Sequence, residues 1–147
     1  MGRVRRLTPL PPRLDLHLAE AEVDYETKRT TSVFVAFPIE AKGPLAPFTD
    51  RRPFIAIWTT TPWTLPANQA VCLHAEIDYA FVHVGDEVLI VAEKLLESVT
   101  KACTLEGVRV LGVKKGREGF EGIETQRPLT TGLSPILIGD FVTLDQG

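Results

Sequence analysis

The sequence has little cysteine, no long apolar run and no excess of positive charge. Its two cysteines, Cys72 and Cys103, lack a further Cys or His at metal-ligand spacing, so the sequence predicts neither a disulfide framework nor a zinc site. We expect both to be buried thiols. No apolar run approaches the roughly 20 residues that span a bilayer, which predicts a chain without a transmembrane helix and without a membrane partner.

The charge balance also excludes one class of nucleic-acid binding. Sixteen Lys and Arg residues against 19 Asp and Glu residues give a formal net charge of −3. Any contact with RNA must therefore be local and depend on shape, because bulk positive charge is absent. With 147 residues, of which 44% are hydrophobic, the chain is long enough for one soluble domain with a core, and its default location is cytoplasmic.

Residues 1–17 contain a proline cluster and no regular period. The prolines at positions 9, 11 and 12 break the amphipathic helix that a transit peptide would need, and no apolar signal core follows them. We expect an unstructured or extended arm over residues 1–17 that is foreign to the rest of the chain, with the ordered domain beginning near Leu18.

Short apolar and β-branched segments, separated by Gly, Pro and Asp, predict strands over most of the remaining chain. Residues 79–84 and 87–92 flank Gly85 and Asp86, a pattern typical of a β-hairpin whose turn uses glycine for a positive φ. Residues 54–58 are continuously apolar and predict a strand buried on both faces. Other strands are expected over residues 19–25, 31–37, 69–74, 108–113 and 136–144.

One helix is expected, over residues 93–102, where Leu95, Leu96, Val99 and Ala102 recur at helical spacing between Lys and Glu residues. Many short strands with a single short helix indicate a mainly β fold, either a compact β-barrel or a curled, predominantly antiparallel sheet.

Residues 59–68, read as Thr-Thr-Thr-Pro-Trp-Thr-Leu-Pro-Ala-Asn, follow the buried strand and are called the threonine loop below. Pro62 and Pro66 exclude a central strand and a regular helix, so a shaped loop is predicted. We expect this loop to line a surface pocket, with Trp58 anchoring its start in the core. Taken alone, a threonine run after a strand is also compatible with simple β-propensity.

With Trp58, the threonine loop resembles the threonine-rich peptide in the editing domain of isoleucyl-tRNA synthetases, the connective polypeptide 1 of these class I enzymes. The valine and leucine enzymes carry an Arg-containing version, so Thr61, Pro62 and Trp63 favour the isoleucine branch. Residues 18–25 and 138–145 resemble the flanks of that domain. The resemblance covers residues 18–147 and implies a partial, barrel-like editing domain, truncated at its C-terminal end.

The resemblance implies hydrolysis of mischarged Val-tRNA(Ile), because a hydrophobic pocket discriminates a single methylene by only about 1–3 kcal/mol and a second, hydrolytic site must correct the errors. It implies the acceptor end of tRNA(Ile) and the rest of the synthetase as partners. Editing needs no metal and no cofactor, whereas the parent synthetase uses ATP. The residues that it implies for the substrate-binding pocket are Thr59, Thr60, Thr61, Pro62, Trp63, Thr64 and Asn68.

The family continues past the position of Gly147 into a segment with a His and an Asp that holds the substrate's amino group, and the HIGH and KMSKS signatures of the synthetic site are absent here. No complete catalytic set is therefore expected, and the isolated chain should not hydrolyse Val-tRNA appreciably. Two alternatives stay open: a non-catalytic β module that binds the tRNA acceptor end, and a gene fragment with no independent role.

Other ionisable residues have a simpler interpretation than catalysis. His74 and His83 fall in predicted strands without a partner Ser, Cys or carboxylate at a suggestive spacing, which favours surface histidines over a general base. Asp140 and Asp145 are expected to be turn or strand-end carboxylates. A small basic cluster is expected to be a solvated face, and consists of Lys114, Lys115 and Arg117.

Overall fold

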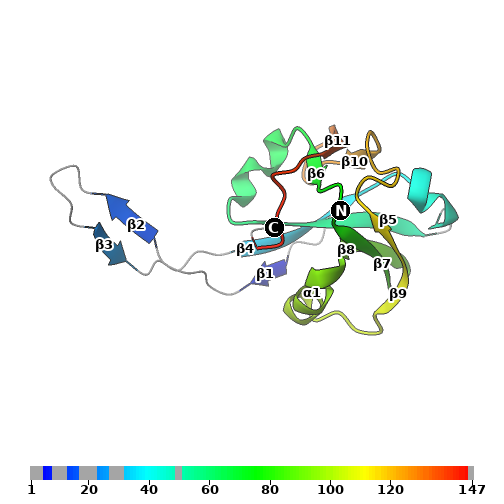
Figure 1. The fold of residues 1–147 in the computed structure, drawn as a ribbon, viewed down its shortest axis with the longest axis horizontal. Helices are drawn as coiled ribbons and strands as arrows, with labels where there is room; N and C mark the ends of the chain where they lie inside the picture. The colour runs from blue at the N-terminus through cyan, green and yellow to red at the C-terminus, as the bar shows by residue number, and fades with distance from the viewer. Residues whose placement is uncertain (1–4, 8–12, 17–22, 27–31, 49–50, 146–147) are drawn as a thin grey trace.

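The computed structural model describes residues 5–7, 13–16, 23–26, 32–48 and 51–145, and Figure 1 shows their arrangement. The strands are β1 (Arg5–Leu7), β2 (Arg13–Leu16), β3 (Val23–Glu26), β4 (Ser32–Pro38), β5 (Arg52–Thr59), β6 (Val71–Leu73), β7 (Asp78–Val84), β8 (Glu87–Ala92), β9 (Arg109–Lys115), β10 (Glu124–Gln126) and β11 (Leu133–Ile138). The α-helix is α1 (Leu96–Cys103), and the 3₁₀ helices are η1 (Gly43–Phe48), η2 (Pro62–Ala67) and η3 (Glu93–Leu95).

The described strands form two principal sheets, one of six strands in the order β1-β4-β5-β8-β7-β9 and one of three in the order β10-β11-β6. Strands β2 and β3 pair separately. Most pairings are antiparallel, and the exceptions are β5 with β8 and β11 with β6. The fold is mainly β with one short α-helix, as predicted, but neither principal sheet closes on itself within the described chain.

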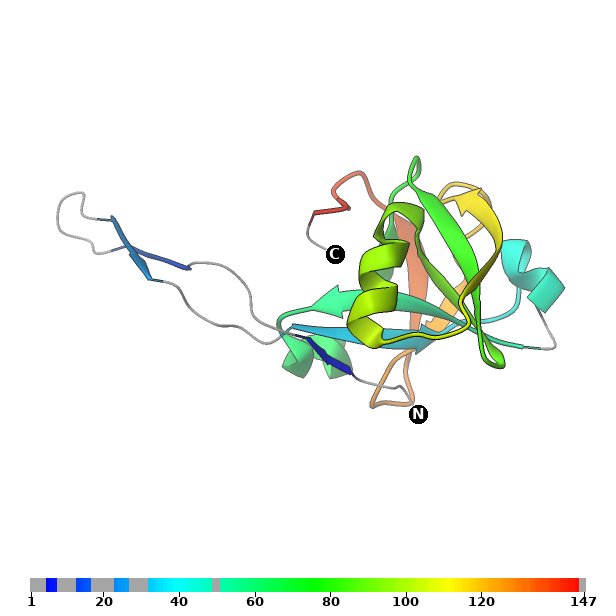
Figure 2. The same cartoon turned by 90° about the horizontal axis from the view of Figure 1, so that it is seen from below.

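The central strands of the large sheet, β4, β5, β7 and β8, are covered on both faces, because their apolar side chains point alternately to one face and the other. Strand β9 at the edge is largely exposed. On one face, Phe37 and Ile90 pack with Phe120 and Ile136 from the small sheet and its connections. On the other face, α1 covers Val82, Leu89 and Val91, and Figure 2 shows the helix lying across the sheet. The predicted strand over residues 54–58 packs on both faces, since Ile55 belongs to the first cluster while Phe54 and Ala56 pack against the second. The predicted double burial is only partial, because Ile55 is buried and the other four residues are half-buried.

The local predictions hold best where the pattern is strongest. The hairpin of β7 and β8 lies at its predicted place, and Gly85 has φ +59°. The predicted helix over residues 93–102 is confirmed as η3 followed by α1. Strands β4, β5, β6 and β9 lie within a few residues of their predicted positions.

The strand predicted over residues 136–144 is wrong in its second half. Strand β11 begins at Leu133 and ends at Ile138, because Gly139 starts a turn in which the Val142 N–H donates to the Gly139 carbonyl at 3.4 Å. Strand β10 was not predicted at all. It has three residues, and only the central Thr125 is buried, so it lacks an apolar pattern.

Two described strands, β1 and β2, lie within residues 1–17, where an unstructured or extended arm was expected. The rest of that stretch lies outside the described residues, and so do residues 19–22 of the strand predicted over residues 19–25, whose last three residues lie in β3. The predicted boundary at Leu18 stays a prediction. Of the helices in the described part of the chain, none has the length and apolar character needed to cross a membrane.

Candidate functional site

The threonine loop leaves the end of β5 and folds into η2 instead of an irregular coil. Pro62 occupies the first turn, where a missing N–H costs no hydrogen bond, and a short 3₁₀ turn also accommodates Pro66. Leu65 is only 5% exposed and joins the main core cluster. One buried side chain therefore fixes the loop to the domain, while most of its other side chains remain on the surface.

The hydroxyls of Thr59, Thr61 and Thr64 bond to the Thr61 backbone and to one another. The Thr61 N–H donates to Thr59 Oγ1 at 3.0 Å, and the two hydroxyl oxygens lie 3.3 Å apart. The Thr64 hydroxyl donates to the Thr61 carbonyl at 2.7 Å, and the Thr64 N–H donates to the same carbonyl at 3.0 Å. These exposed local bonds hold the loop in one shape and leave hydroxyl groups accessible to a ligand.

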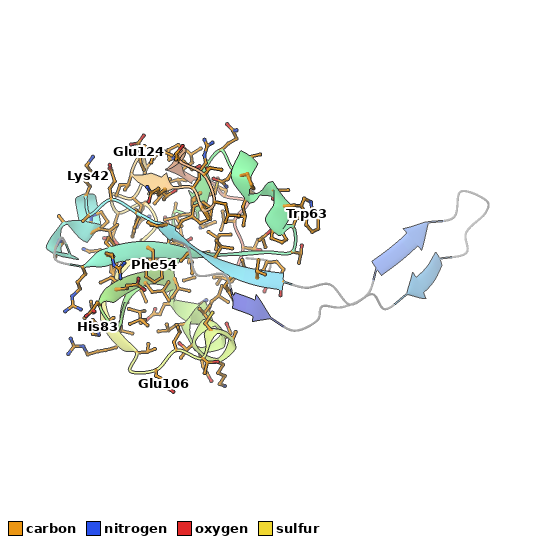
Figure 3. All side chains as sticks on the ribbon, turned by 180° about the vertical axis from the view of Figure 1, so that it is seen from behind. Lys42, Phe54, Trp63, His83, Glu106 and Glu124 are labelled. Atoms are coloured by element: carbon orange, nitrogen blue, oxygen red, sulfur yellow. The ribbon has the colours of Figure 1, made fainter. Side chains whose placement is uncertain are left out.

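Trp63 points away from the body of the domain. Its side chain is 74% exposed, and Figure 3 shows it at the outer edge of the molecule. Trp58 behaves differently, since it is half-buried and borders a groove. Trp58 was expected to anchor the start of the loop in the core, but it belongs to neither core cluster. Trp63 is left as an exposed aromatic surface.

Asn68 ends the loop and is held at three points. Its N–H donates to the Leu65 carbonyl at 3.1 Å, its Nδ2 donates to the Ala70 carbonyl at 3.0 Å, and its own carbonyl accepts from Ser134 Oγ at 3.3 Å. Its Oδ1 is buried, and no residue in the described part of the chain donates to it. A buried acceptor without a donor costs about 1–3 kcal/mol, so this oxygen is a strong candidate to accept from a ligand.

A groove of about 510 Å³ lies beside Asn68. Strand β5, strand β6 and residues 141–144 form much of its wall, which is mostly apolar. From the threonine loop, Asn68 alone lines it, so the prediction that the whole loop lines a pocket is realised at one residue. The structure brings together Trp58, Asn68, Cys72, Phe141 and Leu144 along this groove, and leaves the threonine hydroxyls and Trp63 outside it.

The histidines take structural or remote positions. His74 lies directly after β6, where its Nδ1 accepts from the Glu76 N–H at 3.1 Å and its own N–H donates to the Tyr79 hydroxyl at 3.0 Å. His83 is on β7, far from Trp63 in Figure 3. Burial raises the pKa of Tyr79 above its ordinary value of 10.0, and the hydrogen bond from His74 opposes that rise.

Apart from Cys72, the remaining candidates also lie outside the groove. Asp140 and Asp145 are exposed in the segment after β11. In the basic cluster, Lys115 pairs with Asp78 at 3.2 Å and Arg117 pairs with Glu76, which fits the predicted solvated face. Of the two thiols, Cys103 is buried as expected, but Cys72 is half-buried. Across the described ranges, His, Cys, Asp and Glu side chains form no group of three that could hold a metal ion.

Two polar residues of the site were not predicted. Ser134 is fully buried between Asn68 and Arg127, and the Arg127 Nε donates to its hydroxyl at 3.0 Å. Neither residue belongs to a recognisable pattern in the sequence. Their place beside the loop follows from the parallel pairing of β11 with β6, which begins just after Asn68.

Comparisons with known proteins match the chain to a segment of isoleucine–tRNA ligases. No protein-family model matches the chain. It is 44% identical over 137 residues to isoleucine–tRNA ligase of Brevibacillus brevis and 46% identical over 136 residues to isoleucine–tRNA ligase 1 of Oceanobacillus iheyensis, each match covering 92% of this chain. The isoleucine–tRNA ligase of Pseudomonas aeruginosa is 44% identical over 135 residues, covering 88% of this chain. The chain spans about 14% of the length of each relative.

The fold has a solved counterpart. The crystal structure of GlLeuRS-CP1 matches with a TM-score of 0.64 at 14% identity, over 78% of this chain and 51% of that one. At such low identity the likeness shows the fold alone. The chain therefore has the architecture of a synthetase CP1 domain.

Proposed function

Because the chain is homologous over 92% of its length to a segment of isoleucine–tRNA ligases and has the fold of a CP1 editing domain, we propose that it forms the substrate-binding part of an aminoacyl-tRNA editing site. The proposed substrate is tRNA(Ile) that carries valine in error. In the reaction, water adds to the ester carbonyl, the bond between the acyl carbon and the ribose oxygen breaks, and valine leaves with the tRNA hydroxyl restored.

The observation that carries this proposal is Asn68, which lines the groove and whose buried Oδ1 has no donor among the described residues. An acceptor fixed in this way suits a ribose hydroxyl or an amine, each of which can donate one short hydrogen bond. The adjacent threonine hydroxyls and the exposed Trp63 offer further neutral contacts and a stacking surface. These groups suit the terminal adenosine of a tRNA better than its phosphates.

Rigidity gives such a site its selectivity. Valine and isoleucine differ by one methylene, so a site that excludes the larger side chain must have a rigid pocket wall. Leu65 in the core, the bonds among the threonines and the three bonds on Asn68 all restrict the loop. A fixed loop can also position the attacking water in line with the ester carbonyl.

A second candidate is binding of the acceptor end without chemistry. It is favoured by the composition of the groove, because no carboxylate or imidazole lines it among the described residues. In that case the groups that activate water would come from the rest of a synthetase. The proposed editing reaction requires no metal and no cofactor, while ATP would serve the ligation reaction of a full-length cytoplasmic enzyme.

Binding is tested with an RNA hairpin that ends in CCA and carries valine on its terminal ribose through a non-hydrolysable amide. We expect this RNA to change the tryptophan fluorescence of the chain, and Asn68→Ala to weaken its affinity by about tenfold, as loss of one hydrogen bond to a buried oxygen should do. Gln69→Ala is the matched control, since Gln69 is an exposed neighbouring amide that bonds only to the Ala67 carbonyl in the described structure. Equal affinity for an RNA without the terminal adenosine would contradict the proposal.

Catalysis is tested separately, by release of labelled valine from Val-tRNA(Ile). We expect the full-length Brevibacillus brevis enzyme to release valine, and this chain to do so at least about 100-fold more slowly, because among the described residues no carboxylate or imidazole lines the groove to position the ester and water. Binding without release would favour the second candidate for the isolated chain. Comparable rates would assign catalysis to residues present here.

A further inference from the structure

A chain of hydrogen bonds runs from Arg127, directly after β10, to the threonine loop. The Arg127 Nε donates to Ser134 Oγ at 3.0 Å, and Ser134 Oγ donates to the Asn68 carbonyl at 3.3 Å. A hydroxyl has one proton to donate and lone pairs to accept, so Ser134 can make both bonds at once. Ser134 is fully buried, which shields the link from water.

The guanidinium end of this link is itself fixed. The Arg127 N–H donates to the Gly132 carbonyl at 2.9 Å and closes the β10–β11 turn. The side chain then lies against Gly132, so closely that a Cβ at position 132 would come within 2.9 Å of Arg127 Nη1 and 3.1 Å of its Cδ. A side chain at position 132 would therefore displace the Arg127 side chain from its present path to Ser134.

The other end of the link fixes the candidate binding group. Asn68 is bonded through its N–H, its Nδ2 and its carbonyl, and the last of these bonds comes from Ser134. The first two are local, to residues within three positions, and in the described part of the chain the Ser134 bond is the one that ties Asn68 to β11. Release of that bond would let the Asn68 peptide rotate and carry Oδ1 with it.

We infer that Arg127 and Ser134 are positioning residues. They orient Asn68 for the aminoacylated adenosine, and they do not themselves touch the adenosine. The inference rests on the proposed function for the role of Asn68, but the link itself can be measured in the free protein. Arginine suits the task because its Nε–H lies in a rigid planar group, whereas a lysine ammonium on a flexible stem does not reproduce that geometry.

The simpler explanation is that these bonds only stabilise the small sheet, and Thr125 provides the control for it. Thr125 is as buried as Ser134, and its hydroxyl donates to the Ser134 backbone carbonyl at 2.8 Å. Thr125→Val removes a buried hydrogen bond from the same strand pair while leaving the Ser134 hydroxyl and Asn68 linked. A purely structural role predicts that Ser134→Ala and Thr125→Val behave alike.

The experiment uses the whole chain and two readouts: the NMR signals of the Asn68 side-chain amide without ligand, and the affinity for the valyl-amide RNA. We expect Ser134→Ala to shift the Asn68 amide signals and to weaken binding by about tenfold, the effect of roughly one hydrogen bond. Arg127→Lys and Gly132→Ala should change both readouts in the same direction. Thr125→Val should lower thermal stability but leave the Asn68 amide and the affinity unchanged.

Each outcome decides the inference. Unchanged Asn68 signals in Ser134→Ala, or shifted signals with unchanged affinity, would overturn it, and so would equal effects of Ser134→Ala and Thr125→Val on binding. If Ser134→Ala does not fold, Gly132→Ala decides by the same criteria, because it retains every hydrogen-bonding group. If the unaltered chain does not bind the RNA, the proposed function fails, and the Asn68 signals alone show whether the link orients that residue.

Discussion

Ser134 donates its hydroxyl proton to the backbone carbonyl of Asn68 at 3.3 Å, although the two residues are 66 positions apart in the chain. The contact is possible because β6, which follows Asn68, pairs in parallel with β11, which contains Ser134. The threonine loop therefore connects two sheets. It begins at the end of β5 in the six-stranded sheet and leads into β6 in the three-stranded sheet. The geometry of the candidate site is a tertiary property of the domain.

The hydroxyl of Thr64 should hold the shape of the loop more than the stability of the domain. It donates to the Thr61 carbonyl, which also accepts the Thr64 N–H. We expect Thr64→Val to speed hydrogen exchange at the Thr64 N–H while changing the free energy of unfolding by no more than about 1 kcal/mol, because the bond is exposed. Thr64→Ser keeps the hydroxyl and should restore slow exchange. An unchanged exchange rate in the valine variant would show that the hydroxyl does not order the loop.

Trp63 should matter for binding and not for folding. Its side chain is 74% exposed, so Trp63→Ala is expected to change the free energy of unfolding by less than about 0.5 kcal/mol. If its ring stacks on the terminal adenine, the same substitution should weaken RNA binding by about 1–3 kcal/mol. The control is Val110→Ala, an exposed apolar residue on β9 that should affect neither quantity. Unchanged RNA affinity in Trp63→Ala would exclude a stacking role.

Two glycines with nearly the same backbone conformation should respond differently to a side chain. Gly43 has φ +55° and Gly85 has φ +59°, so alanine at either position pays about 1–2 kcal/mol of left-handed strain. A Cβ at Gly43 would also lie 2.8 Å from the Gly119 carbonyl oxygen, whereas nothing lies within 4 Å at Gly85. We expect urea unfolding to show Gly43→Ala less stable than Gly85→Ala by about 1–3 kcal/mol, the usual cost of overpacking. Equal losses would mean that the η1 segment moves to relieve the clash.

The parts of the fold that could be predicted are those whose signals are local. The β7–β8 hairpin combines an apolar pattern, a glycine turn and adjacent partners, and it was predicted within a residue. Strand β11 was misplaced because Gly139 and Asp140 form a turn inside a run that is otherwise rich in β-branched residues. Strand β10 forms because it pairs with β11. Its three residues are too few to show a strand pattern in the sequence.

The candidate site divides in the same way. The threonine loop was located from its residues, since prolines and threonines constrain local backbone and resemble a known peptide. The hydrogen bonds from Arg127 and Ser134 that hold the end of the loop could not be predicted in this way. They reach Asn68 only after two distant strands, β6 and β11, have paired. A single sequence carries no signal for that pairing.

The last prediction concerns the stability of the domain at high pH. Tyr79 is only 5% exposed, and burial raises the pKa of its hydroxyl above the ordinary value of 10.0. Since the folded state holds this proton more tightly than the unfolded chain, the resulting stabilisation is complete below about pH 10 and is lost as the pH rises through the pKa of the folded state. We expect the free energy of unfolding in urea to fall between about pH 9 and pH 12.

In Tyr79→Phe the fall should be smaller, because that variant has no buried phenol to ionise. Its stability at neutral pH should also be lower, because the bond from the His74 N–H is lost. Lysine ionisation affects both proteins equally, so the difference in slope isolates Tyr79. Identical slopes would show that Tyr79 ionises as freely in the folded domain as in the unfolded chain.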